Sequence, residues 1–194
     1  MTSTEFDVVV ETWIKKITGF ISVGKARILH ARLSKDGLKM LRWHAWIGEA
    51  GALEKISVII TENKKNRSIN FKRAVCNLLL VEWSLKQVER SYYRPFTAVV
   101  ETRIASIRSI LANKAKEYAR DDRLYNFKRA AEIARTTPSK ALIGMMMKHV
   151  VSVVDLVEGT LKATPEMVDE KIGDLINYLI LLDALYKEEE TVAA

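Results

Sequence analysis

Apolar side chains recur at steps of three and four residues along most of this chain, which is the spacing that places them on one face of an α-helix. The first such stripe covers residues 4–18, and a weaker one covers 24–33. Residues 38–48 repeat the pattern until Gly48 and Gly51 interrupt it. Helix is therefore the predicted state of the first quarter of the chain, in three separate segments.

The middle of the chain contains one ambiguous segment between clearer helical patterns. Residues 52–63 are rich in β-branched side chains, so they suit either a helix or a strand. The polar residues 62–67 predict a loop, and Ser68 is placed to cap a long helix over 69–91. A stripe over 96–119 then predicts a half-buried helix.

Two Thr-Pro dipeptides mark the starts of the last two long helices, because a capping hydroxyl is followed by proline at the first helical position. These dipeptides are Thr137-Pro138 and Thr164-Pro165. Gly159 marks the end of the first helix. We therefore expect helices over 138–158 and 165–188, joined by a short connection and antiparallel to each other.

Composition agrees with an all-α fold, a compact multi-helix bundle with an antiparallel C-terminal helix pair. The 194 residues include only eight Gly and three Pro, too few to separate the short strands of an all-β fold. No apolar run approaches the ~20 residues of a membrane span, and no charged-then-apolar leader opens the chain. Together with the single Cys76 in an apolar context, these features predict a cytoplasmic protein with a buried structural thiol and no membrane partner.

Charge divides the chain into two regions, 1–95 and 96–194, which can still belong to one continuous domain. The first region holds 17 Lys and Arg against 9 Asp and Glu, and the second holds 14 against 15, so the net charge of +7 belongs to the first. Such asymmetry can mark a surface for nucleic acid, an acidic protein or an anionic ligand. Scattered solubilising lysines would give the same count, because no basic run is longer than a pair.

A thin polar stripe runs along each of the two C-terminal helices, whose other faces are apolar. Such helices belong in the interior, so the stripes must either turn to solvent or face one another. On the first helix the stripe consists of Lys148, Ser152 and Asp155, flanked by His149 and Glu158. On the second helix it consists of Glu166, Glu170, Asp174 and Asn177.

Facing acidic stripes need a positive counter-charge, because an unpaired buried carboxylate is strongly disfavoured. Four carboxylates supply oxygen ligands that suit Mg²⁺, an ion that keeps positions open for water and phosphate: Asp155, Glu158, Glu170 and Asp174. Three basic side chains can instead neutralise these acids with no metal: Lys148, Arg123 and His149. The residues alone leave both outcomes open.

The acidic pattern resembles that of the MazG-like all-α nucleoside triphosphate pyrophosphohydrolases. The resemblance covers roughly residues 105–188. It rests on Asp155-x-x-Glu158 and on the run Glu170-Lys171-Ile172-Gly173-Asp174-Leu175-Ile176-Asn177-Tyr178. The run from Tyr118 to Phe127, followed by the helix with Lys148-His149, is also similar to small phage-encoded proteins related to that group.

The resemblance implies an Mg²⁺-dependent enzyme that converts a nucleoside triphosphate into a monophosphate and pyrophosphate, usually as a homo-oligomer. It implies that the four acids hold the metal and that the pair Glu170 and Asp174 takes part in catalysis by activating water. That pair is spaced i, i+4, whereas the family usually has i, i+3, and Lys171 stands at the nearer position. Metal binding is therefore predicted more directly than turnover.

Other residues can contact a nucleotide beside such a site. Lys148 and Arg123 would pair with phosphates, and Asn126 and Asn177 would donate or accept hydrogen bonds with sugar or base. Purely structural roles are equally available. Asn126 can cap a helix over 127–135, Asn177 can bond a neighbouring carbonyl, and Lys148 can serve in a salt bridge.

Weaker patterns lie elsewhere in the chain. Trp43 and Trp46 can stack on bases, but two tryptophans three residues apart on an amphipathic helix more often belong to the core. No zinc-ligand spacing, Walker loop, Gly-rich dinucleotide turn or serine-nucleophile elbow is present.

Two functional hypotheses follow from the sequence. The first is an Mg²⁺-dependent nucleotide pyrophosphohydrolase-like protein, active or degenerate, with a nucleotide as its ligand. The second is a non-enzymatic basic helical protein whose first 95 residues bind nucleic acid or an acidic protein partner. In the second case the acidic stripes would form internal ion pairs.

Overall fold

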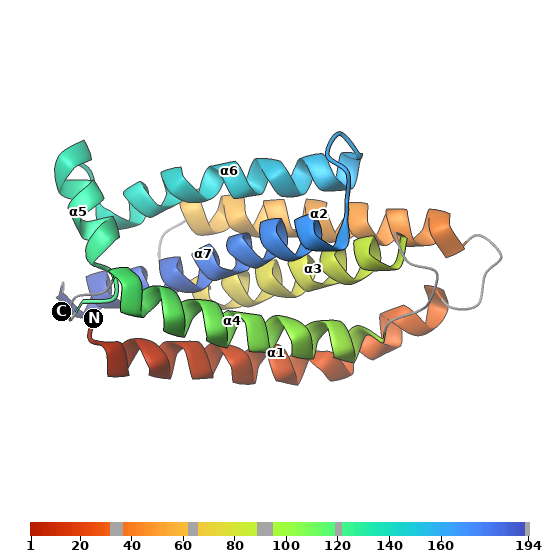
Figure 1. The fold of residues 1–194 in the computed structure, drawn as a ribbon, viewed down its shortest axis with the longest axis horizontal. Coiled ribbons are helices and arrows are strands. Elements are labelled where there is room, and N and C mark those ends of the chain that lie inside the picture. The colour runs from red at the N-terminus through yellow and green to blue at the C-terminus, as the bar shows by residue number, and fades with distance from the viewer. Residues whose placement is uncertain (32–36, 62–65, 89–94, 119–121, 193–194) are drawn as a thin grey trace.

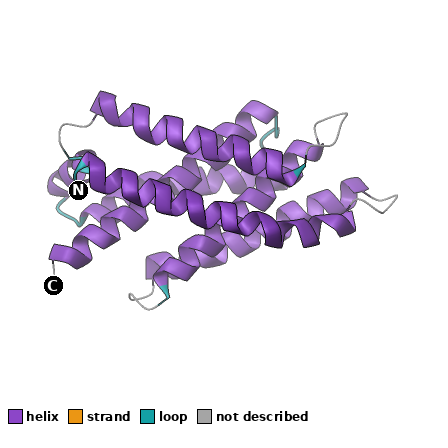
Figure 2. Cartoon of the chain, turned by 90° about the horizontal axis from the view of Figure 1, so that it is seen from below, coloured by secondary structure: helices purple, strands orange, loops and turns teal. Residues whose placement is uncertain are grey.

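The computed structural model of this chain is built from α-helices. It describes residues 1–31, 37–61, 66–88, 95–118 and 122–192, and every regular element within them is a helix (Figure 2). The helices are α1 (Ser3–Ala31), α2 (Gly37–Thr61), α3 (Arg67–Val88), α4 (Phe96–Tyr118), α5 (Tyr125–Ala134), α6 (Pro138–Glu158) and α7 (Pro165–Val192). The predicted all-α class is confirmed.

Helices α2, α3, α6 and α7 form an antiparallel bundle (Figure 1). Helix α2 packs along α3, α3 along α7 and α7 along α6, and α6 closes the ring against α2. Helices α1 and α4 pair with each other and cover the α3–α7 side, while α5 packs against α6 at one end. The bundle therefore combines helices from the basic first half of the chain with the C-terminal pair.

Helix α3 lies at the centre of the apolar core. Every residue from Leu78 to Gln87 is buried, because α2, α7 and the α1–α4 layer surround it. Trp13 of α1 is enclosed on the α7 side, where its indole Nε1 donates to Oδ2 of Asp183 at 2.8 Å. Each fully buried Leu or Phe contributes ~1.5–3 kcal/mol relative to exposure, so this enclosed helix contributes strongly to the stability of the fold.

Two helical breaks expected from the sequence are absent. Helix α1 continues through the gap expected between residues 18 and 24. A Cβ at Gly19 would meet nothing within 4 Å, and a single helical glycine costs only ~1 kcal/mol, which packing of the apolar face outweighs.

Helix α2 is likewise continuous through Gly48 and Gly51. These glycines are contact points with α3 and do not form turns. A Cβ at Gly48 would lie 2.9 Å from Cγ2 of Val81, and one at Gly51 would lie 2.6 Å from Nδ2 of Asn77. The ambiguous segment after them is helical as far as Thr61, and the rest of it lies outside the described residues.

The predicted caps of the C-terminal pair are confirmed. The hydroxyl of Thr137 accepts from the amide of Lys140 at 3.3 Å, and that of Thr164 accepts from the amide of Met167 at the same distance. Gly159 ends α6 with φ 84°, in the left-handed region that favours glycine. Helix α7 extends to Val192, beyond the predicted end at 188.

Two other helix starts were predicted wrongly. Helix α3 begins at Arg67, so Ser68 lies inside it, and the turn is made by Asn66 with φ 71°. Helix α5 begins at Tyr125, so Asn126 lies in its first turn and does not cap it. The predicted loop residues 62–65 and the predicted helix-end residues 89–91 and 119 lie outside the described residues.

The two tryptophans of α2 are on the surface, contrary to the expectation of a core position. Trp43 is 54% exposed and Trp46 is 58% exposed. The buried face of the same helix carries the small residues Ala45, Gly48 and Ala52. Close packing of α2 on α3 requires small side chains, so the large ones project outward.

Two coarser expectations agree with the structure. Cys76 is buried, and burial raises the pKa of its thiol to about 12, as expected of a structural cysteine. No helix in the described part of the chain combines the length and apolar character that crossing a bilayer requires.

Candidate functional site

The polar stripes of α6 and α7 meet at His149 and Asp174. Helix α6 is apolar on nearly all sides, so it packs between α2, α5 and α7 and buries His149 to 7% exposure. Nδ1 of His149 lies 3.6 Å from Oδ2 of Asp174 on α7. This distance is too long for a hydrogen bond, and the contact becomes an ion pair only when the imidazole is protonated. We refer to the surroundings of this contact as the α6–α7 seam.

An aromatic ring also contacts His149. The ring of Tyr178 lies 5.0 Å from the imidazole, tilted by 33°. Phe127 of α5 meets Tyr178 edge to face at 6.5 Å. Burial raises the pKa of the Tyr178 phenol, and the Asp174 carboxylate adds to the rise. His149 therefore contacts both a carboxylate and a neutral phenol ring.

Burial keeps His149 uncharged at neutral pH. It lowers the pKa of the imidazole, and the partly opposing attraction of Asp174 does not restore it. Lys148 and Lys171 lower this pKa further, while Glu170 raises it. A neutral imidazole has one nitrogen free of a proton, so His149 can act as a proton acceptor.

Asp174 and Glu170 lie one helical turn apart on α7. Glu170 is exposed, and its Oε1 accepts from Nζ of Lys171 at 2.7 Å, which lowers the pKa of the carboxyl group. Asp174 is only 26% exposed at its side chain. Both of these predicted catalytic acids, and Lys148, therefore lie within electrostatic reach of His149.

Asn177 adds an unpartnered acceptor on the same helix. Its side chain is 5% exposed, and its Oδ1 accepts no hydrogen bond from the described residues. A buried polar atom left without a partner costs ~1–3 kcal/mol, so this position has a specific need for a donor. The sequence placed Asn177 on the acidic line of α7, but it could not show that the amide would be enclosed.

The first acidic pair has contacts of its own near the C-terminal end of α6. Oδ1 of Asp155 accepts from the hydroxyl of Thr160 at 3.1 Å, at the C-terminal end of α6. Glu158 is exposed there. Burial raises the pKa of Glu49 on α2, and the Glu158 charge adds to the rise. Glu158 therefore lies within electrostatic reach of α2.

The described residues contain no group of three or more His, Cys, Asp or Glu side chains arranged to hold a metal ion. The structure thus does not gather the four predicted carboxylates into one cage within a single chain. It does keep Glu170 and Asp174 on one helical face, and two carboxylates suit an Mg²⁺ ion whose other ligands are water and substrate phosphates. The residues therefore fit an Mg²⁺ site with two protein carboxylates and do not fit a cage of four.

The remaining predicted ligand contacts are divided between the seam and other surfaces. Lys148 is exposed beside His149. Arg123 is directed toward α1, where its Nη2 lies 3.6 Å from Asp7 and its guanidinium lies over the ring of Phe6. Asn126 is exposed in the first turn of α5. Of these three residues, only Lys148 is placed beside His149.

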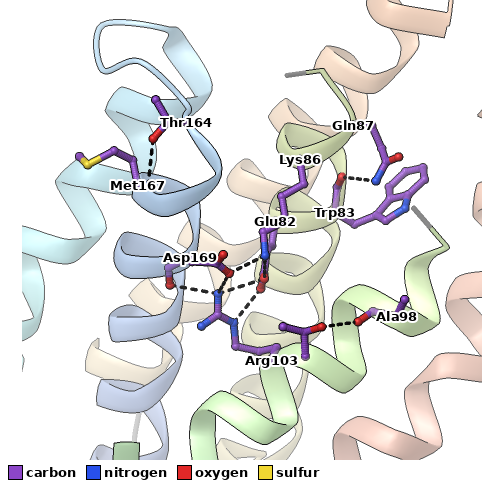
Figure 3. A network of polar contacts seen from close by, with 10 residues as sticks. Glu82, Trp83, Lys86, Gln87, Ala98, Arg103, Thr164, Met167 and Asp169 are labelled. Carbon is purple, nitrogen blue, oxygen red and sulfur yellow. Dashed lines mark hydrogen bonds and ion pairs between the residues drawn. The ribbon is translucent and has the colours of Figure 1, made fainter. Parts of the chain in front are cut away.

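A buried ionic cluster behind α7 was not predicted from the sequence. It joins Glu82 and Lys86 of α3, Arg103 of α4 and Asp169 of α7 (Figure 3). Arg103 donates from Nε and Nη2 to the two Glu82 oxygens at 2.9 and 3.0 Å. Its Nη2 also donates to the carbonyl and the Oδ1 of Asp169, both at 3.0 Å.

Lys86 completes this cluster and balances its charge. Its Nζ donates to Oε1 of Glu82 at 2.8 Å and also to Oδ1 of Asp169. Burial tends to lower the pKa of Arg103, but the carboxylates of Glu82, Asp169 and Asp174 together more than offset this, so the pKa of Arg103 is raised. The i, i+4 pair of opposite charges inside the apolar run of α3 was the sequence signal for a buried ion pair.

The ionic cluster fixes the stretch of α7 that bears the candidate site. Asp169 immediately precedes Glu170, and Gly173 immediately precedes Asp174. A Cβ at Gly173 would lie 2.2 Å from Nη1 of Arg103, so the guanidinium rests directly on the α7 backbone. The cluster therefore holds one side of α7 while Glu170 and Asp174 lie near His149.

Comparison with known proteins returned no matching family model, no similar curated protein and no similar solved structure. Function is therefore inferred from the residues of the α6–α7 seam.

Proposed function

We propose that the α6–α7 seam binds the phosphate chain of a nucleotide and that the protein hydrolyses it in the manner of a MazG-like pyrophosphohydrolase. The main support is the contact of the Asp174 carboxylate with a buried, neutral His149, with Glu170 one turn away. A carboxylate pair beside a neutral imidazole is a combination that can organise an attacking water. The family resemblance described above implies a catalytic role for the same two acids.

The chain's own residues divide the work in this proposal. Glu170 and Asp174 would hold an Mg²⁺ ion shared with substrate phosphates, which supplies charge neutralisation and orientation when bound. His149 accepts a proton from the attacking water through its free ring nitrogen. Lys148, exposed beside it, pairs with a phosphate oxygen.

Asn177 gives this site a means of selecting its ligand. Its Oδ1 is enclosed and accepts no hydrogen bond from the described residues, so a donor on the sugar or base of a nucleotide would satisfy it only if the seam opens on binding. A ligand without such a donor would leave the acceptor buried and unpaired. The amide therefore contributes to selectivity, whereas the carboxylates contribute to turnover.

The proposal is tested with a panel of nucleoside triphosphates in the presence of Mg²⁺, followed by pyrophosphate release. We expect one or more nucleotides to be cleaved, and Glu170→Gln and Asp174→Asn each to lower kcat/KM by ~100-fold or more. Glu101→Gln, an exposed acid on α4, is the matched control and should keep full activity.

A second measurement separates ligand binding from turnover. Mg²⁺ together with the best nucleotide should raise Tm of the wild type, and should raise it less in Asp174→Asn. If none of the nucleotides in the panel yields pyrophosphate, the enzymatic part of the proposal is contradicted. If Glu170→Gln and Asp174→Asn both retain the full thermal shift, the assignment of the site to these two carboxylates is contradicted.

A further inference from the structure

The outer face of α2 carries four residues at successive i+4 positions: Arg42, Trp46, Ala50 and Glu54. All four are exposed, and Trp43 and Ile47 adjoin them on the same face. We call these four residues the α2 outer stripe. Side chains spaced by four residues stack along one side of a helix, so the stripe is one continuous strip of surface.

Exposure of this much aromatic surface is unusual for a helix whose opposite face is fully packed. Trp43 and Trp46 each expose more than half of their surface, and Ile47 is 37% exposed. Single exposed apolar residues need no explanation, but neighbouring tryptophans on one helical face mark an interaction surface. Trp is also among the residues most enriched at the energetic centres of protein interfaces.

The order of residues in the stripe makes it complementary to itself. From Arg42 to Glu54 the stripe presents a cation, a large ring, a small side chain and an anion. In the reverse direction it presents an anion, a small side chain, a large ring and a cation, so each position of one copy faces its complement on the other. An antiparallel second copy would therefore place Arg42 against Glu54 and Trp46 against Ala50, each pair occurring twice. Contacts that repeat in this reciprocal way define an interface with twofold symmetry.

We infer that the α2 outer stripe is the interface of a homodimer in which two α2 helices pack antiparallel. The match of charge and size along the stripe supports a second copy of this chain over a nucleic acid. A polynucleotide gains affinity from several cations per site, whereas the stripe offers Arg42 at one end and the acid Glu54 at the other. Glu54 also contacts Lys55 on its own helix, and the dimer adds a second cation to that carboxylate.

This inference is independent of the chemistry proposed for the α6–α7 seam. The stripe lies on α2, and its residues take no part in the contacts of His149 or Asp174 that the structure describes. Loss of dimerisation with retained pyrophosphate release, or the reverse, would separate the two proposals.

The first test is sedimentation velocity of the full chain over a concentration series. The wild type should sediment as a dimer, and Trp46→Ala should raise the dimer dissociation constant by at least about thirty-fold, equivalent to ~2 kcal/mol. Far-ultraviolet circular dichroism should be unchanged, because Trp46 is exposed in the monomer. Met147→Ala and Val151→Ala, exposed apolar residues of α6, are matched controls that should leave the dimer intact.

Charge reversal tests the antiparallel register. Arg42→Glu and Glu54→Arg should each weaken the dimer several-fold, and the double variant should restore it, because the reversed pairs then match again. A helix-packing effect within the monomer would not show this rescue. Restoration by the double variant therefore separates an intermolecular contact from a local one.

Tryptophan fluorescence gives an independent readout. Trp13 and Trp83 are buried at 0% and 1% exposure, so red-shifted emission comes from Trp43 and Trp46 and should move to shorter wavelength as the dimer forms. A wild type that stays monomeric throughout the series would overturn the inference. A dimer that remains intact in Trp46→Ala but dissociates in Val151→Ala would also overturn it. So would a monomer whose exposed tryptophans are quenched by oligothymidylate at low salt.

Discussion

Gly173 shows how a single absent side chain positions the candidate site. The guanidinium of Arg103 occupies the space where a Cβ would stand, 2.2 Å from Nη1 and 3.0 Å from Cζ. Arg103 cannot retreat easily, because two hydrogen bonds hold it to Glu82. The requirement here is for close approach, since Gly173 lies inside a regular helix.

Gly173→Ala should therefore destabilise the protein, although alanine is the better helix former. We expect a loss of ~1–3 kcal/mol in the free energy of unfolding, measured by urea titration. Gly144→Ala is the matched control, because a Cβ there would meet nothing within 4 Å, and it should stabilise α6 by up to ~1 kcal/mol. Equal effects of the two substitutions would show that Arg103 moves aside without cost.

At the scale of the element, the contact between α6 and α7 includes His149, which meets Asp174 and Tyr178 of α7. His149 is buried, and burial lowers its pKa from the ordinary value of 6.5. The unfolded chain therefore binds a proton at this position more readily than the folded one. The stability due to a neutral His149 is complete above pH 6.5 and is lost as the pH falls through the lowered pKa.

His149→Gln should make this pair less sensitive to acid. Between pH 7 and pH 5, the free energy of unfolding of the wild type should fall more steeply than that of the variant. The other groups that act on this imidazole are Asp174, Glu170, Lys148 and Lys171, and all of them remain in the variant. Parallel pH profiles for the two proteins would show that His149 does not titrate differently on unfolding.

At the scale of the whole molecule, the Arg103 cluster joins the α1–α4 layer to the bundle. One guanidinium on α4 contacts both α3 and α7, and it is only 2% exposed. Its removal would leave the fully buried Glu82 with Lys86 alone as a cationic partner. Breaking one side of a buried ion pair is costly because the remaining charge stays out of water.

Arg103→Met should therefore lower the free energy of unfolding by ~3–5 kcal/mol, measured by chemical denaturation. Arg108→Met is the matched control on the same helix, because Arg108 also makes two hydrogen bonds to a glutamate, Glu11, but on the surface. Its effect should be small, since water screens that pair. If Arg108→Met lowered the free energy of unfolding strongly and Arg103→Met only slightly, the buried cluster would not be the contact that joins the α1–α4 layer to the bundle.

The local sequence pattern was sufficient to predict the helix ends that are defined by capping residues. Thr137, Thr164 and Gly159 gave the limits of the C-terminal pair because a cap depends on a few adjacent backbone groups. The pattern failed at Gly48 and Gly51. A glycine can mark either a turn or a close contact, and only the presence of α3 beside α2 distinguishes them.

The candidate site shows the same division. Periodicity placed Lys148, Glu170 and Asp174 on polar stripes, and the structure brings them to the same seam. The spacing could not show that Glu158 comes within electrostatic reach of Glu49 on α2, or that Asp174 meets His149. Helix rotation and crossing decide which side chains meet, and these depend on the packing of all neighbouring helices.

By itself, then, the sequence determined the all-α class, the C-terminal helix pair and its caps, because these follow from side-chain period and local hydrogen bonding. Tertiary structure alone decided that Glu82 and Arg103 pair in the interior, that Asn177 is enclosed and that Trp43 and Trp46 project outward. Each of these depends on how closely two helices approach, and a one-dimensional pattern contains no distance between helices.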